Sequence, residues 1–338
     1  LSKNVPEGGP VSSMDQLEIG AGLSWEADIW GKIRSTKRAA EAGYLQTQAA
    51  HQVVTSKLIT GIASVYFQLQ TLDKQIKVTE KTIITRKNGL ETTLALKDAG
   101  RVTEVAVKQT EAQVYNAEAL LIELKKNVAL LENTLSILLG GGPREIHRTD
   151  LDRNLIDVDL KTGVPSQLLV NRPDLRAAEM GLRAAFEQTN IARSMFYPSL
   201  NINAQTGLQS LEIKDLFSSN SLFAGLIGGL TQPIFQGRQI RTNHEVAQSK
   251  EEIAKLQFMQ TFLNASKEVA DALYSIEAAE EKLVFKAKEQ EALDLAVEYS
   301  QELLNHGMAD YLEVLRAEEN ALYTHIDLIN TENEKLQA

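Results

Sequence analysis

The side chains that most often do chemistry are scattered along this sequence. The five histidines stand beside no metal-ligand spacing, and the five methionines do not cluster as soft-metal sites require. Without cysteine, disulfides and thiolate metal sites are ruled out. No phosphate-binding loop, dinucleotide-binding glycine turn or Ser-His-acid grouping is recognisable. The sequence therefore predicts a protein that is not an enzyme and that holds no cofactor and no metal.

Acidic residues stand at two glycine turns, GRVTE at 100–104 and GMADYLE at 307–313. Helix capping explains them simply, because Asp310 with Glu313 fits an N-cap box and Glu104 suits the positive end of a helix dipole. The functional alternative is that these turns form a gate and a docking surface at one end of the molecule. Both interpretations can hold together, so the elements that position the turns decide their meaning.

The composition narrows the class of partner. The chain has 338 residues and a formal net charge of −10, which disfavours nucleic acid because phosphate binding needs a basic face. No run of about 18 apolar residues is present, so the sequence contains no membrane-spanning helix. The opening stretch, LSKNVPEGGPVSSMDQ, reads as a loop, and we expect further residues before Leu1 in the full-length protein.

The clearest periodicity is the strict alternation in LEIGAGLSWEADIW, residues 17–30, which predicts a strand with one apolar and one polar face. A second strand is expected over 199–209, with Asn and Gln on its polar face, and a less regular third at about 222–235. The first strand would be about 43 Å long and, tilted by about 45°, would rise about 30 Å, the hydrocarbon thickness of a membrane. The competing interpretation is a half-buried sheet in an ordinary domain.

Aromatic residues lie where the predicted strands meet predicted helices, which favours a membrane-interface belt. Three strands are too few to close a barrel, and open strand edges are not tolerated in lipid. If the strands span a membrane, several chains must therefore share one barrel. The predicted membrane-interface aromatics are Trp30, Phe196, Tyr197 and Phe235.

Most of the remaining chain is predicted to be helical, because apolar residues recur every seven positions, as at Leu315, Leu322 and Ile329. Sustained seven-residue spacing predicts left-handed coiled-coil seams. A cytoplasmic coiled-coil rod would share this pattern, but here the long helices adjoin the predicted strands, which favours a helical tube that continues a pore. The expected helices run from about 33 to 98, 103 to 139, 171 to 195, 238 to 305, and onward from 310.

An internal repeat relates the two halves of the chain. DIWGKIRS at 28–35 matches PIFQGRQIR at 233–241, and DAGRVTEV at 98–105 matches NHGMADYLEV at 305–314. The resulting domain prediction is a loop and strand over 1–30, a long antiparallel helix pair over 31–140, a linker over 141–172, a helix over 173–195, a hairpin over 196–236, and a second helix pair over 237–338.

Several stretches resemble the TolC-like outer-membrane efflux proteins, in the efflux lipoprotein branch of the nodulation-T and OprM types. The resemblance covers nearly the whole chain from Leu17. It implies a mainly α protein with a membrane β part, in which long coiled-coil helices form a periplasmic α-barrel tunnel joined to the strands of a transmembrane β-barrel shared by a trimer. The stretches are WEADIWGKIRS (25–35), NRPDLRAAE (171–179), FYPSLNI (196–202), PIFQGRQIR (233–241) and HGMADYLEVLRAEENAL (306–322).

The resemblance also implies a role and partners. It implies a passive exit duct for small molecules in the outer membrane of a Gram-negative bacterium, driven by an inner-membrane resistance-nodulation-division transporter through a periplasmic adaptor. A lipid anchor is expected on residues before Leu1. The alternatives left open are a soluble coiled-coil scaffold and the outer-membrane duct of a protein secretion system.

By match to the family's tip motifs, the two glycine turns supply the adaptor contacts and the periplasmic gate. Glu104 and Glu313 match the acidic gate positions, whose carboxylates we expect to favour cations. The family often has an acid or glutamine two or three residues after the position of Glu313, but this chain has Arg316 there. This departure argues against a gate formed by a simple ring of acidic residues. The implied adaptor contacts are Arg101, Val102, Thr103, Met308, Ala309 and Asp310.

Overall fold

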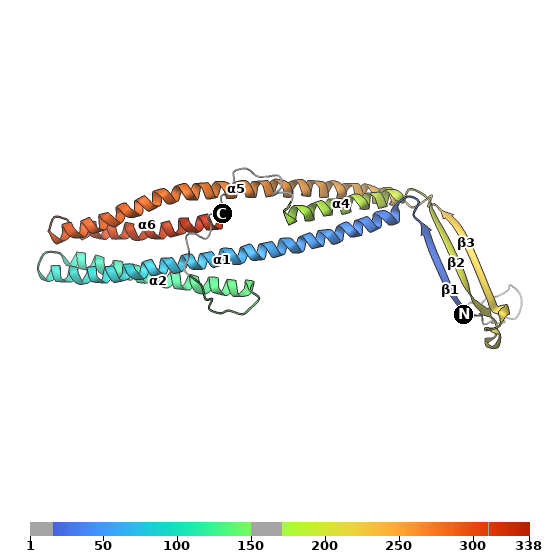
Figure 1. The fold of residues 1–338 in the computed structure, drawn as a ribbon, viewed down its shortest axis with the longest axis horizontal. Coiled ribbons are helices and arrows are strands. Elements are labelled where there is room, and N and C mark those ends of the chain that lie inside the picture. The colour runs from blue at the N-terminus through green and yellow to red at the C-terminus, as the bar shows by residue number, and fades with distance from the viewer. Residues whose placement is uncertain (1–15, 150–170, 310) are drawn as a thin grey trace. The chain divides into compact units, whose positions relative to one another are not determined.

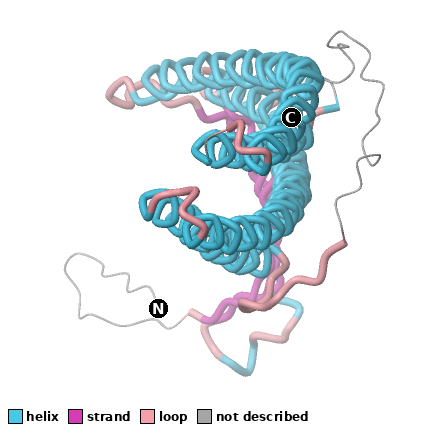
Figure 2. Tube along the Cα trace, turned by 90° about the vertical axis from the view of Figure 1, so that its left-hand side faces the viewer, coloured by secondary structure: helices cyan, strands magenta, loops and turns pink. Residues whose placement is uncertain are grey.

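The computed structural model describes residues 16–149, 171–309 and 311–338, and helices make up most of them (Figures 1 and 2). One three-stranded sheet accompanies the helices, so the prediction of a mainly α protein with a β part is confirmed. In chain order the elements are β1 (Leu17–Ala27), α1 (Lys32–Asp98), α2 (Glu104–Leu138), α4 (Pro173–Ser194), β2 (Ser199–Ser210), the 3-10 turns η1 (Ile213–Asp215) and η2 (Ser219–Ser221), β3 (Leu222–Thr231), α5 (Gln239–Asn305) and α6 (Tyr311–Gln337).

The chain forms two compact units. The first contains the sheet, α4 and the parts of α1 and α5 nearest the strands, up to Ala50 and from Arg172 to Phe262. The second contains α2, α6 and the remaining parts of α1 and α5. The two longest helices, of 67 residues each, therefore contribute to both units.

The sheet is an antiparallel meander in the order β1-β2-β3. Leu23 of β1 lies opposite Ala204 of β2, and Ala204 lies opposite Leu226 of β3. Residues that lie opposite one another in antiparallel strands share a face of the sheet. This register therefore brings the alternating apolar positions of all three strands to one face.

A pair of glycines lets β1 and β2 approach closely near one end of the sheet. Gly20 lies opposite Gly207, which in turn lies opposite Phe223 of β3. A Cβ added to Gly207 would lie 2.4 Å from the carbonyl oxygen of Ile19 and 2.6 Å from the Cα of Gly20. It would also lie 2.9 Å from the ring of Phe223. The ring therefore packs over Gly207 in space that a larger residue would fill.

An ion pair joins α4 to the start of α1 inside the first unit. Arg38 donates hydrogen bonds from Nε and Nη2 to the two carboxylate oxygens of Glu187, at 2.6 and 3.0 Å. Glu187 is only 6% exposed, and the guanidinium of Arg38 holds the pKa of its carboxyl below the ordinary value. Such a two-pronged contact fixes direction as well as distance, so it orients α4 on α1.

The hairpins α1–α2 and α5–α6 begin their turns with the same backbone geometry. Gly100 and Gly307 have positive φ angles of 69° and 71°. In both turns the glycine N–H donates to the carbonyl three residues earlier, and the next N–H donates to the carbonyl five residues earlier. This pair of hydrogen bonds is the Schellman arrangement, which glycine favours because it has no Cβ. The repeat found in the sequence is therefore also a repeat of backbone structure.

Two columns of residues spaced seven apart along α2 supply its buried side. Threonines in the same core keep their hydroxyls satisfied, since Thr79, Thr93 and Thr110 each donate to the carbonyl four residues earlier at 2.8 Å. The core can therefore bury these hydroxyls without leaving an unpaired donor. The buried members of the two α2 columns are Val107, Val114 and Leu135 in one, and Thr110, Ala117 and Leu124 in the other.

α6 packs against the first hairpin inside the second unit. Tyr311 is 5% exposed, and its hydroxyl lies beside the hydroxyls of Thr93 of α1 and Thr110 of α2. Toward the end of α6, Glu332 accepts a 2.9 Å ion pair from Lys74 of α1. These contacts connect the two hairpins at both ends of α6.

We predict that Glu187→Gln lowers the melting temperature by about 2–4 °C at pH 7, as followed by circular dichroism. The pair with Arg38 lowers the pKa of Glu187 in the folded state, so its stabilisation is present above the carboxyl's unfolded pKa. That stabilisation is lost as the pH falls through the folded pKa, and the difference from wild type should shrink in acid. Glu212→Gln is the control, because Glu212 pairs with Lys214 on an exposed surface. A deficit that is the same at every pH would contradict this assignment.

Gly207→Ala should separate β1 from β2, because its Cβ would collide with backbone atoms that have no rotamer to change. We expect a loss of about 1–3 kcal/mol in the free energy of unfolding, together with a lower folded yield. Gly225→Ala is the matched control, since an added Cβ there meets nothing within 4 Å. Equal yields and equal melting temperatures for the two variants would refute the close-approach explanation.

Candidate functional site

One face of the sheet is almost wholly apolar and open. Leu23 is 69% exposed, Leu226 is 75% exposed and Leu230 is 69% exposed, although a folded protein normally covers such a continuous surface. Thr206 and, at the end of β2, Ser210 supply the two hydroxyls on this face. The face consists of Leu17, Ile19, Ala21, Leu23, Trp25 and Ala27 of β1, of Leu200, Ile202, Ala204, Thr206, Leu208 and Ser210 of β2, and of Leu222, Ala224, Leu226, Gly228 and Leu230 of β3.

The opposite face is polar on β1 and β2. The Ser24 hydroxyl donates to Oδ1 of Asn203 at 2.7 Å, across the two strands. Asn201 and Gln205 continue the amide row on β2, whereas β3 contributes Phe223 and Ile227 with glycines between and beside them. The sequence alone left β3 irregular, and the register explains why, because its alternation is between leucines and a mixture of glycine, aromatic and aliphatic residues.

The predicted membrane-interface aromatics lie at the junctions between strands and helices, and three of the four make ring contacts there. Trp30 stacks on Tyr197 with the ring centroids 4.5 Å apart, and its Nε1–H donates to the carbonyl of Pro198 at 2.8 Å. Phe196 meets His244 of α5 edge to face at 5.5 Å. This contact of His244 could not be predicted from the sequence, because its partner Phe196 is 48 positions away.

Phe235 is the fourth predicted aromatic, and it is 95% exposed. Beside this junction a cavity of about 350 Å³ is lined by residues that include Trp30 and Tyr197. Asp28 closes the start of α1, because its carboxylate oxygens accept the N–H groups of Ile33 and Arg34 at 2.9 Å. These hydrogen bonds satisfy helix N-terminal donors, so the strand-to-helix corner is fixed by one carboxylate.

The side chains predicted as adaptor contacts are presented at the two turns. Arg101, Thr103 and Met308 are exposed, and Val102 and Ala309 are half-buried. Thr103 is the N-cap residue of α2, but its side chain makes no cap hydrogen bond, so capping does not account for this side chain. Asp310, the sixth predicted contact, lies outside the described residues.

The predicted gate residues differ in their electrostatic surroundings. Glu104 forms a 2.5 Å ion pair with Lys97 across the first turn, and this contact holds the pKa of the Glu104 carboxyl below its ordinary value. Glu313 and Arg316 are exposed near the start of α6, and no ion pair is recorded for either within the described part of the chain. The carboxylate of Glu104 is thus partly neutralised within the chain, whereas that of Glu313 has no ion pair among the described residues.

The described residues lack both a metal-binding cluster and a membrane-spanning helix. No group of three or more His, Asp or Glu side chains among them is placed to hold a metal ion. In the same part of the chain, no helix combines the length and the apolar composition that crossing a membrane requires.

Comparison with known proteins gives a consistent result. A family model described as outer membrane efflux protein matches residues 4–141 and 164–338. The chain is 26% identical over 323 residues to the cation efflux system protein CusC of Escherichia coli K12, covering 95% of this chain and 71% of that protein. It is also 26% identical over 324 residues to the solvent efflux pump outer membrane protein SrpC of Pseudomonas putida, covering 96% and 69%.

Solved structures agree in fold. The outer membrane protein VceC of Vibrio cholerae aligns with a TM-score of 0.89 at 25% identity, covering 99% of this chain and 81% of that one. The outer-membrane channel OprN aligns with a TM-score of 0.94 at 24% identity, covering 99% and 76%. Because the family model matches most of its length, this chain belongs to the outer membrane efflux protein family.

Proposed function

We propose that this chain is one subunit of a homotrimeric outer-membrane channel in a tripartite efflux pump. The channel is a passive exit duct for small molecules. An inner-membrane transporter of the resistance-nodulation-division class supplies the energy, and a periplasmic adaptor joins the two. The observation that carries the proposal is the sheet itself, whose apolar face is open to its surroundings and whose opposite face carries serine and amide side chains.

Family membership confirms the predicted family, the outer-membrane location and the expectation that the protein is not an enzyme. The sheet's chemistry fits this location, because its apolar face is suited to lipid and its polar face to a water-filled lumen. The stacked pair of Trp30 and Tyr197 suits the boundary between membrane and water.

Sharing of the barrel among subunits follows from the strand edges. In the described sheet β1 and β3 are the edge strands, and an edge in lipid needs a partner for its backbone N–H and C=O groups. A further subunit supplies this partner when the sheets of several copies join into one barrel. An exposed apolar stripe along α2 supports a matching contact between helices of neighbouring subunits, since Tyr115, Ile122, Leu130 and Ile137 are 55–70% exposed.

The two turns are the proposed adaptor contact and gate. Their shared Schellman backbone presents Arg101 and Met308 outward at equivalent positions of the repeat. When several subunits form a ring, these turns give the adaptor a set of similar binding sites that repeats around the ring. Cargo selection is assigned to the pump, because relatives of equal identity are named for cations in one case and for solvents in another.

We predict that Leu226→Arg prevents stable insertion and that Ile227→Arg does not. The two residues are adjacent and similarly exposed, but they lie on opposite faces of the sheet. An arginine facing lipid near the bilayer centre costs about 2–4 kcal/mol, whereas one facing a wet lumen costs little. The measurement is the amount of folded oligomer in the outer-membrane fraction. Equal loss for both variants, or for neither, would contradict the assignment of faces.

We predict that Lys97→Gln increases the cation preference of the channel and that Glu313→Gln decreases it. Removing Lys97 frees the carboxylate of Glu104 from its ion pair, and removing Glu313 deletes an unpaired negative charge. Reversal potentials of single channels in a salt gradient measure the preference. Lys214→Gln is the control, because Lys214 lies in the turn between β2 and β3 and not in either glycine turn. This variant should have the reversal potential of wild type. Reversal potentials that are unchanged in both test variants would remove these residues from the gate.

A further inference from the structure

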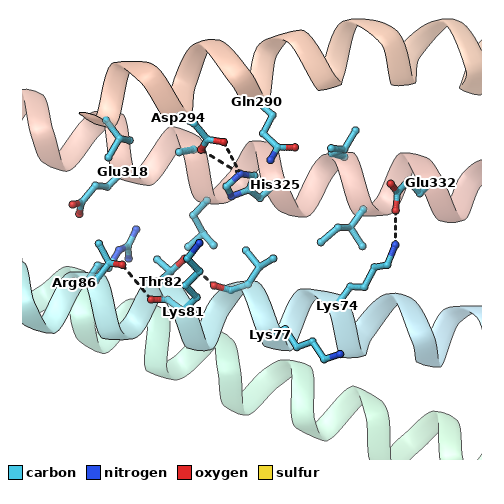
Figure 3. A pocket seen from close by; sticks show the side chains of 17 residues that line it. Lys74, Lys77, Lys81, Thr82, Arg86, Gln290, Asp294, Glu318, His325 and Glu332 are labelled. Atoms are coloured by element: carbon cyan, nitrogen blue, oxygen red, sulfur yellow. Dashed lines mark hydrogen bonds and ion pairs between the residues drawn. The ribbon is translucent and has the colours of Figure 1, made fainter. Parts of the chain in front are cut away.

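The second unit contains a pocket of about 650 Å³ that the transport role does not use. Its walls come from α1, α5 and α6 (Figure 3). This volume lies within the range of pockets that bind small organic ligands. Part of the lining is apolar, and it includes Val78, Val297, Leu322, Leu328 and Ile329.

A buried arginine faces this pocket without a carboxylate partner. Arg86 is 3% exposed, and its Nη1 donates to the backbone carbonyl of Gln113 at 2.8 Å. Its Nε is buried and has no hydrogen-bond partner in the described structure. Burial lowers the pKa of the guanidinium, which reflects the cost of keeping this charge away from water. A buried donor without an acceptor costs free energy that an incoming acceptor can recover.

The carboxylate of Glu318 on the other wall forms no ion pair with Arg86. Glu318 of α6 lies across from Arg86 in Figure 3, but its Oε1 accepts a 3.1 Å hydrogen bond from Gln301 of α5. No ion pair between Glu318 and Arg86 is recorded, although the two attract at longer range. The Nε–H of Arg86 therefore has no acceptor in this structure and can donate to a ligand that reaches it.

Other charges make the α1 wall cationic. Lys74 pairs with Glu332 at 2.9 Å, and His325 meets Asp294 at 3.3 Å (Figure 3). Lys81 is exposed at the same wall, and among the described residues it forms no ion pair. Over the whole lining, the cationic side chains Lys74, Lys77, Lys81 and Arg86 outnumber the carboxylates Asp294, Glu318 and Glu332 by one.

We propose that this pocket is a binding site for a small organic anion, a carboxylate attached to an apolar body. The carboxylate reaches the Nε edge of Arg86 as that side chain shifts toward the pocket, and Lys81 adds a second positive charge. The apolar body lies against the aliphatic lining of α1, α5 and α6. Arginine is suited to this ligand because its planar donor edge matches the two oxygens of a carboxylate.

A small solute fits the site better than a segment of another protein. The ligand must enter a half-open concavity between three helices of one subunit and then reach a side chain that is almost fully buried. The site lies wholly in the second unit, so binding there does not depend on the proposed transport role.

The test is isothermal titration calorimetry with octanoate as the probe and the full-length protein purified in a non-ionic detergent. We compare wild type with Arg86→Gln, which removes the charge, and with Arg86→Lys, which keeps the charge but loses the planar edge. Lys87→Gln is the matched control, because Lys87 is the next residue and pairs instead with Glu118 of α2 at 2.7 Å. Octylammonium has the same alkyl chain and the opposite charge. It therefore measures nonspecific partition of the alkyl chain into the detergent or the protein.

Wild type and Lys87→Gln should bind octanoate with affinities within about twofold of each other, and Arg86→Gln should bind at least about tenfold more weakly. Arg86→Lys should fall between them. Octylammonium should give no saturable signal. Octanoate binding that is unaffected by Arg86→Gln, or that octylammonium reproduces, would overturn the proposal. If Arg86→Gln does not fold, Lys81→Gln decides, with weaker binding expected and unchanged binding overturning it.

Discussion

The constraint on which the rest of the structure depends is the open apolar face of the β1-β2-β3 sheet. Each fully buried leucine contributes about 1.5–3 kcal/mol, so a face with leucines exposed by about 70% is strongly unfavourable in water. The described helices leave this face uncovered, and the edge strands also need backbone partners. In the proposed channel, lipid against the face and further copies at the edges satisfy both demands.

Duplication gave the two halves one backbone but different chemistry. Gly100 and Gly307 close their turns with the same hydrogen bonds. Four positions after the first glycine stands Glu104, paired with Lys97, whereas the same position after the second is Tyr311, buried against α1 and α2. One turn therefore carries a compensated charge pair, and the other anchors the second hairpin to the first. A ring built from both turns would alternate in electrostatics while remaining uniform in shape.

Much of the fold could be predicted from the sequence because it rests on local periodicity. Alternation located β1 and β2, seven-residue columns located the buried sides of the helices, and glycines located the turns. What the sequence could not supply was pairing over long distances. The contact of Arg38 with Glu187 joins positions 149 apart, and the isolated charge of Arg86 is recognisable only once three helices surround it. At the proposed gate, the sequence indicates the acidic positions, but the ion pair of Glu104 with Lys97 depends on the geometry of the turn.

The most direct test of the account is whether the apolar face touches lipid. Trp25 lies on that face and Trp30 at the junction, and these are the two tryptophans of the chain. In a Trp30→Phe variant reconstituted into vesicles, the fluorescence of Trp25 reports on that face alone. The account predicts strong quenching by lipids brominated along their acyl chains and little quenching by aqueous iodide. Quenching by iodide with no response to brominated lipid would contradict it.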